Sequence, residues 1–171
     1  MPAVPYRSYL MEQLRDVDEA AAYLTACYED SDLVHIAAAI IEQSGRILIT
    51  RRPEGAFMGG LWEFPGGKVE PGESAAMAVV RECWEECALE VAVEALLNRS
   101  VHRDAQRPLQ LDFFRCRLLG GTLRLHAATA HAWVTAAELV HYPMPPANRS
   151  VCAYLMQAAE ANTLRRDDTR A

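Results

Sequence analysis

The sequence lacks the features that mark secreted disulfide-bonded proteins and membrane-spanning proteins. Its five cysteines are an odd number and include no CxxC pair, which argues against a secreted disulfide framework. The N-terminus has no basic region followed by an apolar run, and no apolar segment approaches the length of a transmembrane helix. We therefore expect a reduced, cytoplasmic protein with no membrane partner.

Positive charge is also scarce. Lys68 is the only lysine, and 17 basic residues stand against 23 acidic ones, which gives a formal net charge of -6. A sequence-independent grip on DNA or RNA needs a basic surface, so we expect no stable nucleic-acid binding. A polyphosphate can still bind to such a protein if a divalent cation lies between the two sets of negative charges.

The length of 171 residues and the hydrophobic content of 51% predict one globular domain with a substantial core. Residues 1–32 differ in pattern and form an N-terminal extension. Within it, the Ala-rich run Val17 to Tyr28 predicts a short helix for packing or oligomer contact. Residues 33–164 form the main domain, and the charged residues 165–171 form a frayed tail. The sequence is compatible with a monomer or a homodimer.

Strands alternate with a few helices in the main domain. Leu33–Ile41 and Arg46–Thr50 are predicted strands that a tight turn joins into a hairpin. Ser74 is the predicted N-cap of a helix over Ala75–Cys87. Four further strands are predicted: at Leu89–Leu97, at Leu109–Leu118 after a polar loop, after a turn at Gly120-Gly121, and from Trp133 onward. This order predicts an α+β or α/β fold, a sandwich built on a mixed sheet, and we take α+β as the prediction.

The predicted helix carries three glutamates on one face, because Glu82, Glu85 and Glu86 stand at positions i, i+3 and i+4. Carboxylates this close repel one another, and Mg²⁺ or Mn²⁺, which prefer oxygen ligands, would offset the repulsion. A solvated acidic face answered by arginines is the alternative. The opposite side of the helix suits burial and carries Met77, Val80, Cys83 and Trp84.

The residues around these glutamates have a specific spacing: Gly67-x5-Glu73-x7-Arg81-Glu82-Cys83-x-Glu85-Glu86-x-Ala88-Leu89. This pattern resembles the Nudix box, a loop–helix–loop that binds metal in the Nudix hydrolases. The resemblance implies an α/β/α sandwich and an enzyme that cleaves phosphoanhydride bonds of nucleotides. One position departs from the box, since Ala88 stands where a glycine is usual. That glycine serves a helix end with positive φ, so we expect an altered helix terminus there.

The resemblance also implies roles for individual residues. Glu82, Glu85 and Glu86 would be ligands of Mg²⁺, with Mn²⁺ possible, and the backbone carbonyl of Gly66 would join them. Glu73 and Arg81 would form a pair that holds the loop against the helix and orients the acidic cluster. Glu82 would also be the general base for the attacking water.

Outside the box, the chain resembles the MutT-like branch of the family from about Leu33 to Ala159. Asn148, in the run Pro145-Pro146-Ala147-Asn148, matches an asparagine that reads an oxidised guanine base in that branch. Arg52 and Phe64 would also face the nucleoside. The alternatives are that Asn148 caps a helix running to about Ala161, and that Phe64 is a core residue.

One feature of that branch is missing. MutT-like enzymes usually bring another metal-binding glutamate from the loop that corresponds to Leu125–His131, and this segment contains no acid. His126 or His131 could replace it as ligand or base, although a lone loop histidine more often does neither.

The predicted function is hydrolysis of a nucleoside triphosphate to a monophosphate and pyrophosphate, with Mg²⁺. Oxidised dGTP and CTP or modified dCTP are the expected substrates, which makes the enzyme a sanitiser of the nucleotide pool. The alternatives are a Nudix hydrolase of another nucleoside diphosphate derivative and a non-catalytic MutT-like nucleic-acid recognition module.

Overall fold

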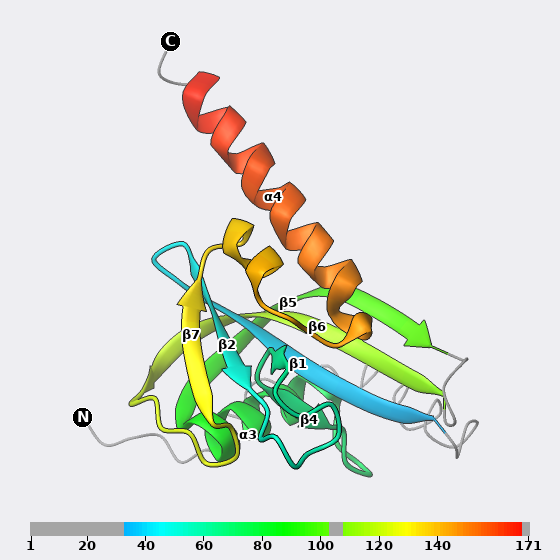
Figure 1. Ribbon diagram of the computed structural model, residues 1–171. Helices are drawn as coiled ribbons and strands as arrows, with labels where there is room; N and C mark the ends of the chain where they lie inside the picture. The colour runs from blue at the N-terminus through cyan, green and yellow to red at the C-terminus, as the bar shows by residue number, and fades with distance from the viewer. Residues whose placement is uncertain (1–32, 103–107, 169–171) are drawn as a thin grey trace.

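Figure 1 shows the computed structural model of the protein, which describes residues 33–102 and 108–168. The predicted helix at Val17–Tyr28 lies outside these residues. Seven strands form one sheet with the order β3-β2-β1-β6-β5, while β4 pairs with β1 and β7 pairs with β2. The strands are β1 (Val34–Gln43), β2 (Arg46–Arg51), β3 (Trp62–Glu63), β4 (Gly66–Lys68), β5 (Leu89–His102), β6 (Leu109–Gly121) and β7 (Ala130–Val134).

The sheet is mixed, as predicted. Strands β1 and β6 run parallel, with Val34 opposite Leu109, and every other recorded strand pair is antiparallel. The predicted hairpin is present, because β1 and β2 pair through Gln43 and Arg46. Its two turn residues, Ser44 and Gly45, both have positive φ, at 52° and 74°. Such a turn matches the right-handed twist of the flanking strands.

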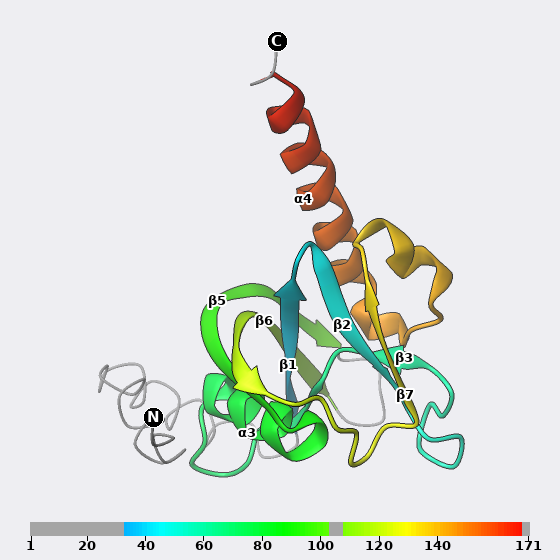
Figure 2. The same ribbon diagram turned by 90° about the vertical axis from the view of Figure 1, so that its left-hand side faces the viewer.

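Helical elements cover both faces of the sheet. On one face α3 (Ala75–Cys87) packs through Val79 and Cys83, both fully buried, against β1, β5 and β6. On the other face lie two short 3-10 helices and a long α-helix, namely η1 (Ala137–His141), η2 (Pro146–Asn148) and α4 (Arg149–Asp168). The first turns of α4 pack on the hydrophobic core of this second face, and the rest of the helix extends away from the sheet (Figures 1 and 2). The three layers confirm the predicted α/β/α arrangement.

The ends of α3 follow from local chemistry. Ser74 is the N-cap, and its hydroxyl accepts a hydrogen bond from the backbone N–H of Met77 at 3.2 Å. At the other end Ala88 adopts the left-handed conformation, with φ 53° and ψ 35°, and its N–H bonds to carbonyl oxygens of the last turn. The box position that usually holds glycine therefore keeps the glycine-type backbone, although its Cβ makes that conformation unfavourable.

Replacing Ala88 by glycine is expected to stabilise the protein by about 1 kcal/mol, because glycine adopts positive φ without a steric penalty. Urea denaturation measures the change in the free energy of unfolding. The matched control is Ala76→Gly inside α3, where the same substitution should destabilise by about 1 kcal/mol. Loss of stability in both variants would contradict the strain assigned to Ala88.

Five expectations about the elements were wrong. No strand lies between the glycine pair and β7 in the described chain, because β6 itself continues to Gly121. Strand β5 continues to His102, so part of the predicted polar loop is strand paired with β6. Trp133 lies near the end of β7 and does not begin a strand. The C-terminal helix does not end near residue 161 but continues to Asp168. Trp84, expected on the buried side of α3, is 49% exposed.

Within the described ranges, no helix is long and apolar enough to cross a membrane.

Candidate active site

The glutamate face of α3 lies against β4. Strand β4 pairs antiparallel with β1, and this places Gly67 opposite Ala37. A Cβ at Gly67 would overlap the carboxylate of Glu82, so glycine is the residue that lets Glu82 lie directly on the strand backbone. The N–H of Gly66 donates to Glu86 Oε2 at 3.3 Å. The strand and the helix are therefore joined through two of the three glutamates predicted to bind metal.

Arg81 connects the loop before α3 to the acidic cluster. Its guanidinium bonds both carboxylate oxygens of Glu73, at 2.8 and 2.9 Å, which confirms the predicted pair. The same group donates to Glu82 at 2.8 Å, to Glu85 at 3.1 Å and to the carbonyl oxygen of Lys68 at 2.9 Å. Because the Arg81 side chain is only 17% exposed, these contacts are much less screened than a surface ion pair. The contacts of Glu73 and Lys68 fix the loop on the helix.

Glu86 is the most strained member of the cluster electrostatically. The pKa of Glu86 is raised to about 7, mainly by burial and to a smaller extent by the nearby carboxylates of Glu82 and Glu63. The Gly66 N–H and the charge of Arg52 act in the opposite direction and do not cancel the effect. A positive charge beside Glu86 would stabilise its ionised form at neutral pH.

Glu63 belongs to this site and was missed by the sequence prediction. It lies on β3 opposite Thr50, forms a partly buried ion pair with Arg52, and lies close enough to Glu86 to raise the pKa of that residue. Burial also raises the pKa of Glu63, while its hydrogen bond with Arg52 lowers it. The sequence signal that could have revealed this pair is that Arg52 and Glu63, which have opposite charges, flank the same glycine-rich loop.

The donor set suits a divalent cation. Two guanidinium groups, those of Arg52 and Arg81, face five carboxylates, which are those of Glu63, Glu73, Glu82, Glu85 and Glu86. The excess of carboxylate oxygens matches the ligands that Mg²⁺ and Mn²⁺ prefer. In the described part of the chain, however, no three acidic, histidine or cysteine side chains already surround one point.

Three hydrogen bonds keep the glutamates of α3 apart. Glu82 and Glu85 both turn toward Nη1 of Arg81, while Glu86 turns toward the Gly66 N–H. A cation would therefore take over the place that Arg81 Nη1 occupies between Glu82 and Glu85. Since the Glu85 side chain is 58% exposed, it can turn without disturbing the core.

The three predicted nucleoside-binding residues lie in different surroundings. Arg52 is held at both ends, because its Nε donates to the carbonyl oxygen of Phe57 at 2.8 Å and its Nη1 pairs with Glu63. Phe64 is 3% exposed, with its ring edge-on to Phe113 at a centroid distance of 6.0 Å. These contacts make Phe64 a core residue in this structure, and its contact with a nucleoside stays a prediction.

Asn148 is buried without a strong partner. It is 5% exposed, and its Nδ2 lies 4.0 Å from the sulfur of Met144, which is a weak contact. No hydrogen bond from its side chain to the first turn of α4 is found in the described chain, so the alternative of a helix cap is not supported. A buried amide normally finds partners for its oxygen and nitrogen, and Asn148 therefore has hydrogen-bonding capacity to spare.

The segment that carries Asn148 is attached to the strand that carries Glu63. The N–H of Trp62 donates to the carbonyl oxygen of Pro143 at 2.8 Å, and the rings of Trp62 and Tyr142 meet edge-on at 5.0 Å. Strand β3 thus links the acidic cluster to the segment 142–148, although these regions are about 80 residues apart in the sequence.

The segment Leu125–His131, which lacks the acidic residue usual in MutT-like enzymes, lies against the end of α3. His126 Nδ1 is 2.7 Å from the carbonyl oxygen of Glu85, and the His126 N–H bonds to the carbonyl oxygen of Glu86. His131 is exposed on β7 opposite Thr50. Of the two histidines proposed as replacements for the missing glutamate, only His126 has a hydrogen bond to α3 in the described chain.

A family model adds to this geometry. The model of the NUDIX domain matches residues 36–154 of the chain. The chain belongs to the Nudix family. The predicted enzyme class is thereby confirmed as a Nudix hydrolase.

Relatives of this Nudix chain carry names from the predicted branch. The CTP pyrophosphohydrolase of Escherichia coli K12 is 38% identical over 116 residues, which cover 68% of this chain and 86% of that protein. The 8-oxo-dGTP diphosphatase of the same organism is 33% identical over 123 residues, covering 71% and 95%. The solution structure of the E. coli ORF135 protein superposes with a TM-score of 0.67 and 34% identity, covering 76% of this chain and 93% of that one. The fold prediction is confirmed by this likeness.

Proposed function

We propose that this Nudix hydrolase is a Mg²⁺-dependent nucleoside triphosphate pyrophosphohydrolase that releases a monophosphate and pyrophosphate. Oxidised dGTP and CTP or modified dCTP are the proposed substrates, and the proposed role is cleansing of the cytoplasmic nucleotide pool. The observation that carries the proposal is the cluster of carboxylates around Arg81, with the buried amide of Asn148 on the segment attached to its neighbour β3. The names of the E. coli relatives support this substrate class.

Glu82, Glu85 and Glu86 would hold Mg²⁺ together with the Gly66 carbonyl, and Mn²⁺ could replace it. The metal supplies charge neutralisation on the phosphates and a more acidic water. Arg81 and Glu73 act as positioning residues, because their paired hydrogen bonds keep the loop before α3 on the helix. Glu82 is proposed to accept the proton of the attacking water, as its carboxylate lies between Arg81 and the Gly67 backbone.

The nucleoside is proposed to bind on the side of Glu63 that faces away from the acidic cluster of α3. Asn148 would offer one donor and one acceptor to the edge of the base. Arg52 would border the nucleoside from the residue that follows β2, and Phe64 would support the pocket from the core beneath. In this arrangement phosphates and base meet different parts of the site, joined by β3.

A panel of nucleotides tests the proposal. Canonical and oxidised nucleoside triphosphates, a nucleotide sugar and a dinucleoside polyphosphate are incubated with Mg²⁺, and products are followed by chromatography and pyrophosphate release. We expect monophosphate and pyrophosphate from one or a few triphosphates. Preferred cleavage of the sugar or dinucleoside compound would instead indicate a hydrolase of another diphosphate derivative. No turnover of any compound would favour a recognition module.

Replacing Asn148 by alanine is expected to lower kcat/KM about tenfold for the preferred nucleotide, mainly through KM, because the base edge loses its hydrogen bonds. A nucleotide with a poorly accepted base should lose less than about twofold, since it never formed those bonds. The matched control is Asn98→Ala, which removes an exposed contact with Ser150. An equal loss for all bases would make Asn148 structural.

A further inference from the structure

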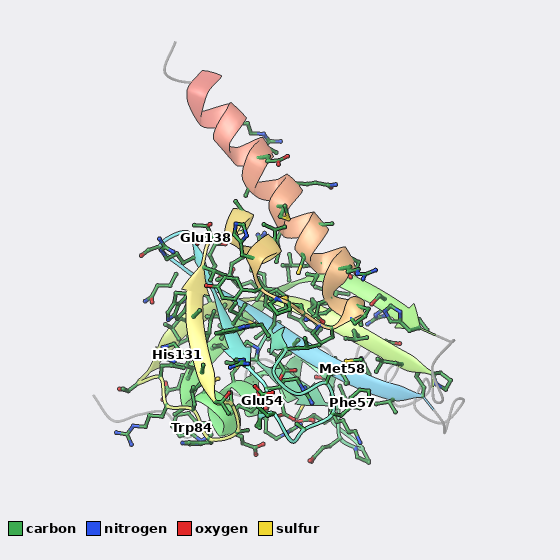
Figure 3. All side chains as sticks on the ribbon, viewed as in Figure 1. Glu54, Phe57, Met58, Trp84, His131 and Glu138 are labelled. Carbon is green, nitrogen blue, oxygen red and sulfur yellow. The ribbon has the colours of Figure 1, made fainter. Side chains whose placement is uncertain are left out.

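Phe57 is the most exposed of the large hydrophobic side chains in the described part of the chain. It lies in the loop between β2 and β3 and is 80% exposed, and Met58 beside it is 40% exposed. Figure 3 labels both side chains on this loop together with Glu54. A single exposed apolar residue is ordinary in itself. The loop that carries this one, however, is built to hold it in place.

Several contacts fix the loop. The Arg51 side chain donates to the carbonyl oxygen of Gly60 at 3.1 Å, and the N–H of Gly60 donates to the carbonyl oxygen of Arg52 at 3.1 Å. Arg52 Nε bonds the carbonyl oxygen of Phe57 itself, at 2.8 Å. The backbone of Phe57 is therefore tied to a residue of the candidate active site, while its ring stays in solvent.

The loop also contains strained and tightly packed positions. Met58 has φ 55°, a conformation that costs a non-glycine residue free energy. A Cβ at Gly59 would overlap the carbonyl oxygen of Glu54, so the loop closes tightly on itself. Strain of this kind persists where the surrounding contacts over-determine it, and it is typical of functional loops.

The loop stands beside both halves of the site. Its base is the Arg52–Glu63 pair, which neighbours Glu86. Its end leads into Trp62, which is bonded to the segment that carries Asn148. Figure 2 shows β3, into which the loop leads, beside the segment between η1 and α4. The hydrogen bond from Arg52, a residue proposed to face the nucleoside, anchors the Phe57 backbone on this side of the site.

We propose that Phe57, flanked by Met58, packs on the face of the substrate's nucleobase and so contributes to nucleotide binding. This inference rests on the proposed function. An aromatic ring stacks on any base, because every base has a π-face, so its contribution is tolerant of base identity. Asn148 would then select the base through its edge, and Phe57 would strengthen binding of every nucleotide.

Isothermal titration calorimetry in Mg²⁺ tests the inference on the full chain. The probes are the α,β-methylene analogues of CTP and dGTP, which carry a base, and inorganic tripolyphosphate, which does not. The Phe57→Ala variant should bind both nucleotide analogues about tenfold more weakly. Its affinity for tripolyphosphate should stay within about twofold of the wild-type value, because tripolyphosphate has no base to stack on the ring. The Phe57→Trp variant should bind the nucleotide analogues as well as the wild type does, because tryptophan keeps an aromatic ring at this position.

The control variant is Val140→Ala, which truncates another exposed apolar side chain, on η1, and should leave every affinity unchanged. Since the Phe57 ring is exposed, the melting temperature of Phe57→Ala should match that of the wild type. Unchanged nucleotide affinity in Phe57→Ala, or an equal weakening for tripolyphosphate, would overturn the inference alone. If the wild type binds neither nucleotide analogue, the proposed function fails together with it.

Discussion

Replacing Glu86 by glutamine is expected to lower kcat/KM for the nucleotide substrate by about 100-fold or more. Loss of groups that merely support a metal ligand already costs about 10–100-fold, and Glu86 is proposed as a ligand itself. Glutamine keeps the shape of the side chain and can still accept the Gly66 N–H bond, but it carries no charge. The measurement is steady-state turnover with Mg²⁺. A variant with near-normal activity would contradict the ligand assignment.

The same substitution should not destabilise the protein when a chelator removes divalent cations. The pKa of Glu86 is raised from an ordinary 4.5 to about 7 by burial, so the folded state holds this proton more tightly than the unfolded state. Between these two values the folded state binds more protons, and stability therefore falls as pH rises. Glutamine does not titrate and so removes this contribution to the pH dependence of stability. In thermal melts with chelator, the melting temperature of the variant should fall less between pH 4.5 and 7 than that of the wild type.

The matched control for both measurements is Glu70→Gln, which changes an exposed glutamate in the loop before α3. It should keep the activity and the pH profile of the wild type. A steeper pH dependence in Glu86→Gln than in the wild type would show that Glu86 is not the buried carboxylate responsible.

Replacing Asp112 by alanine is expected to destabilise the protein by about 3 kcal/mol, because it breaks a buried ion pair from one side. Asp112 on β6 is fully buried, and both its oxygens bond Arg99 on β5, at 2.7 and 2.8 Å. His35 on β1 contacts the same carboxylate at 2.9 Å. Removal of the Asp112 carboxylate leaves Arg99 and His35, on the two strands that flank β6, without their shared hydrogen-bond acceptor. The lower end of the usual range applies because Arg99 is 54% exposed and can regain water.

Urea denaturation measures this loss, and Glu94→Ala is the control. Glu94 pairs with Arg117 across the same two strands at 3.2 Å, but both side chains are largely exposed. Screening by water limits such a pair to about 0–1 kcal/mol. Similar losses in the two variants would mean that burial of Asp112 does not determine its contribution.

The parts of the fold that sequence predicted are those that local rules determine. The helix Ala75–Cys87 has its observed bounds because Ser74 caps one end and no glycine or proline interrupts it. The Glu73–Arg81 pair followed from the Nudix spacing, and the contacts of Arg81 with Glu82 and Glu85 show that the three residues share one region. One expectation about this helix was wrong: Ala88 was expected to alter the helix end, but it keeps the left-handed backbone that a glycine would adopt there.

What the sequence did not reveal depends on contacts between distant segments. Glu63 joins the site only because β2 and β3 pair, which brings Arg52 beside it. The acceptor role of Asp112 needs β1, β5 and β6 side by side. Trp84 was assigned to the buried side from periodicity alone, but no element covers that part of α3 in the described structure, and the ring stays half exposed.

The central claim is that one helix face holds divalent cations against the phosphates of a nucleotide. A crystal structure with Mn²⁺ and a non-hydrolysable nucleotide analogue, with anomalous scattering used to locate the metal, tests it most directly. We predict manganese between the phosphates and the carboxylates of Glu82, Glu85 and Glu86, with Arg81 still bound to Glu73. Phosphates bound elsewhere, with Glu82 and Glu85 still paired to Arg81 and no metal beside them, would contradict the claim.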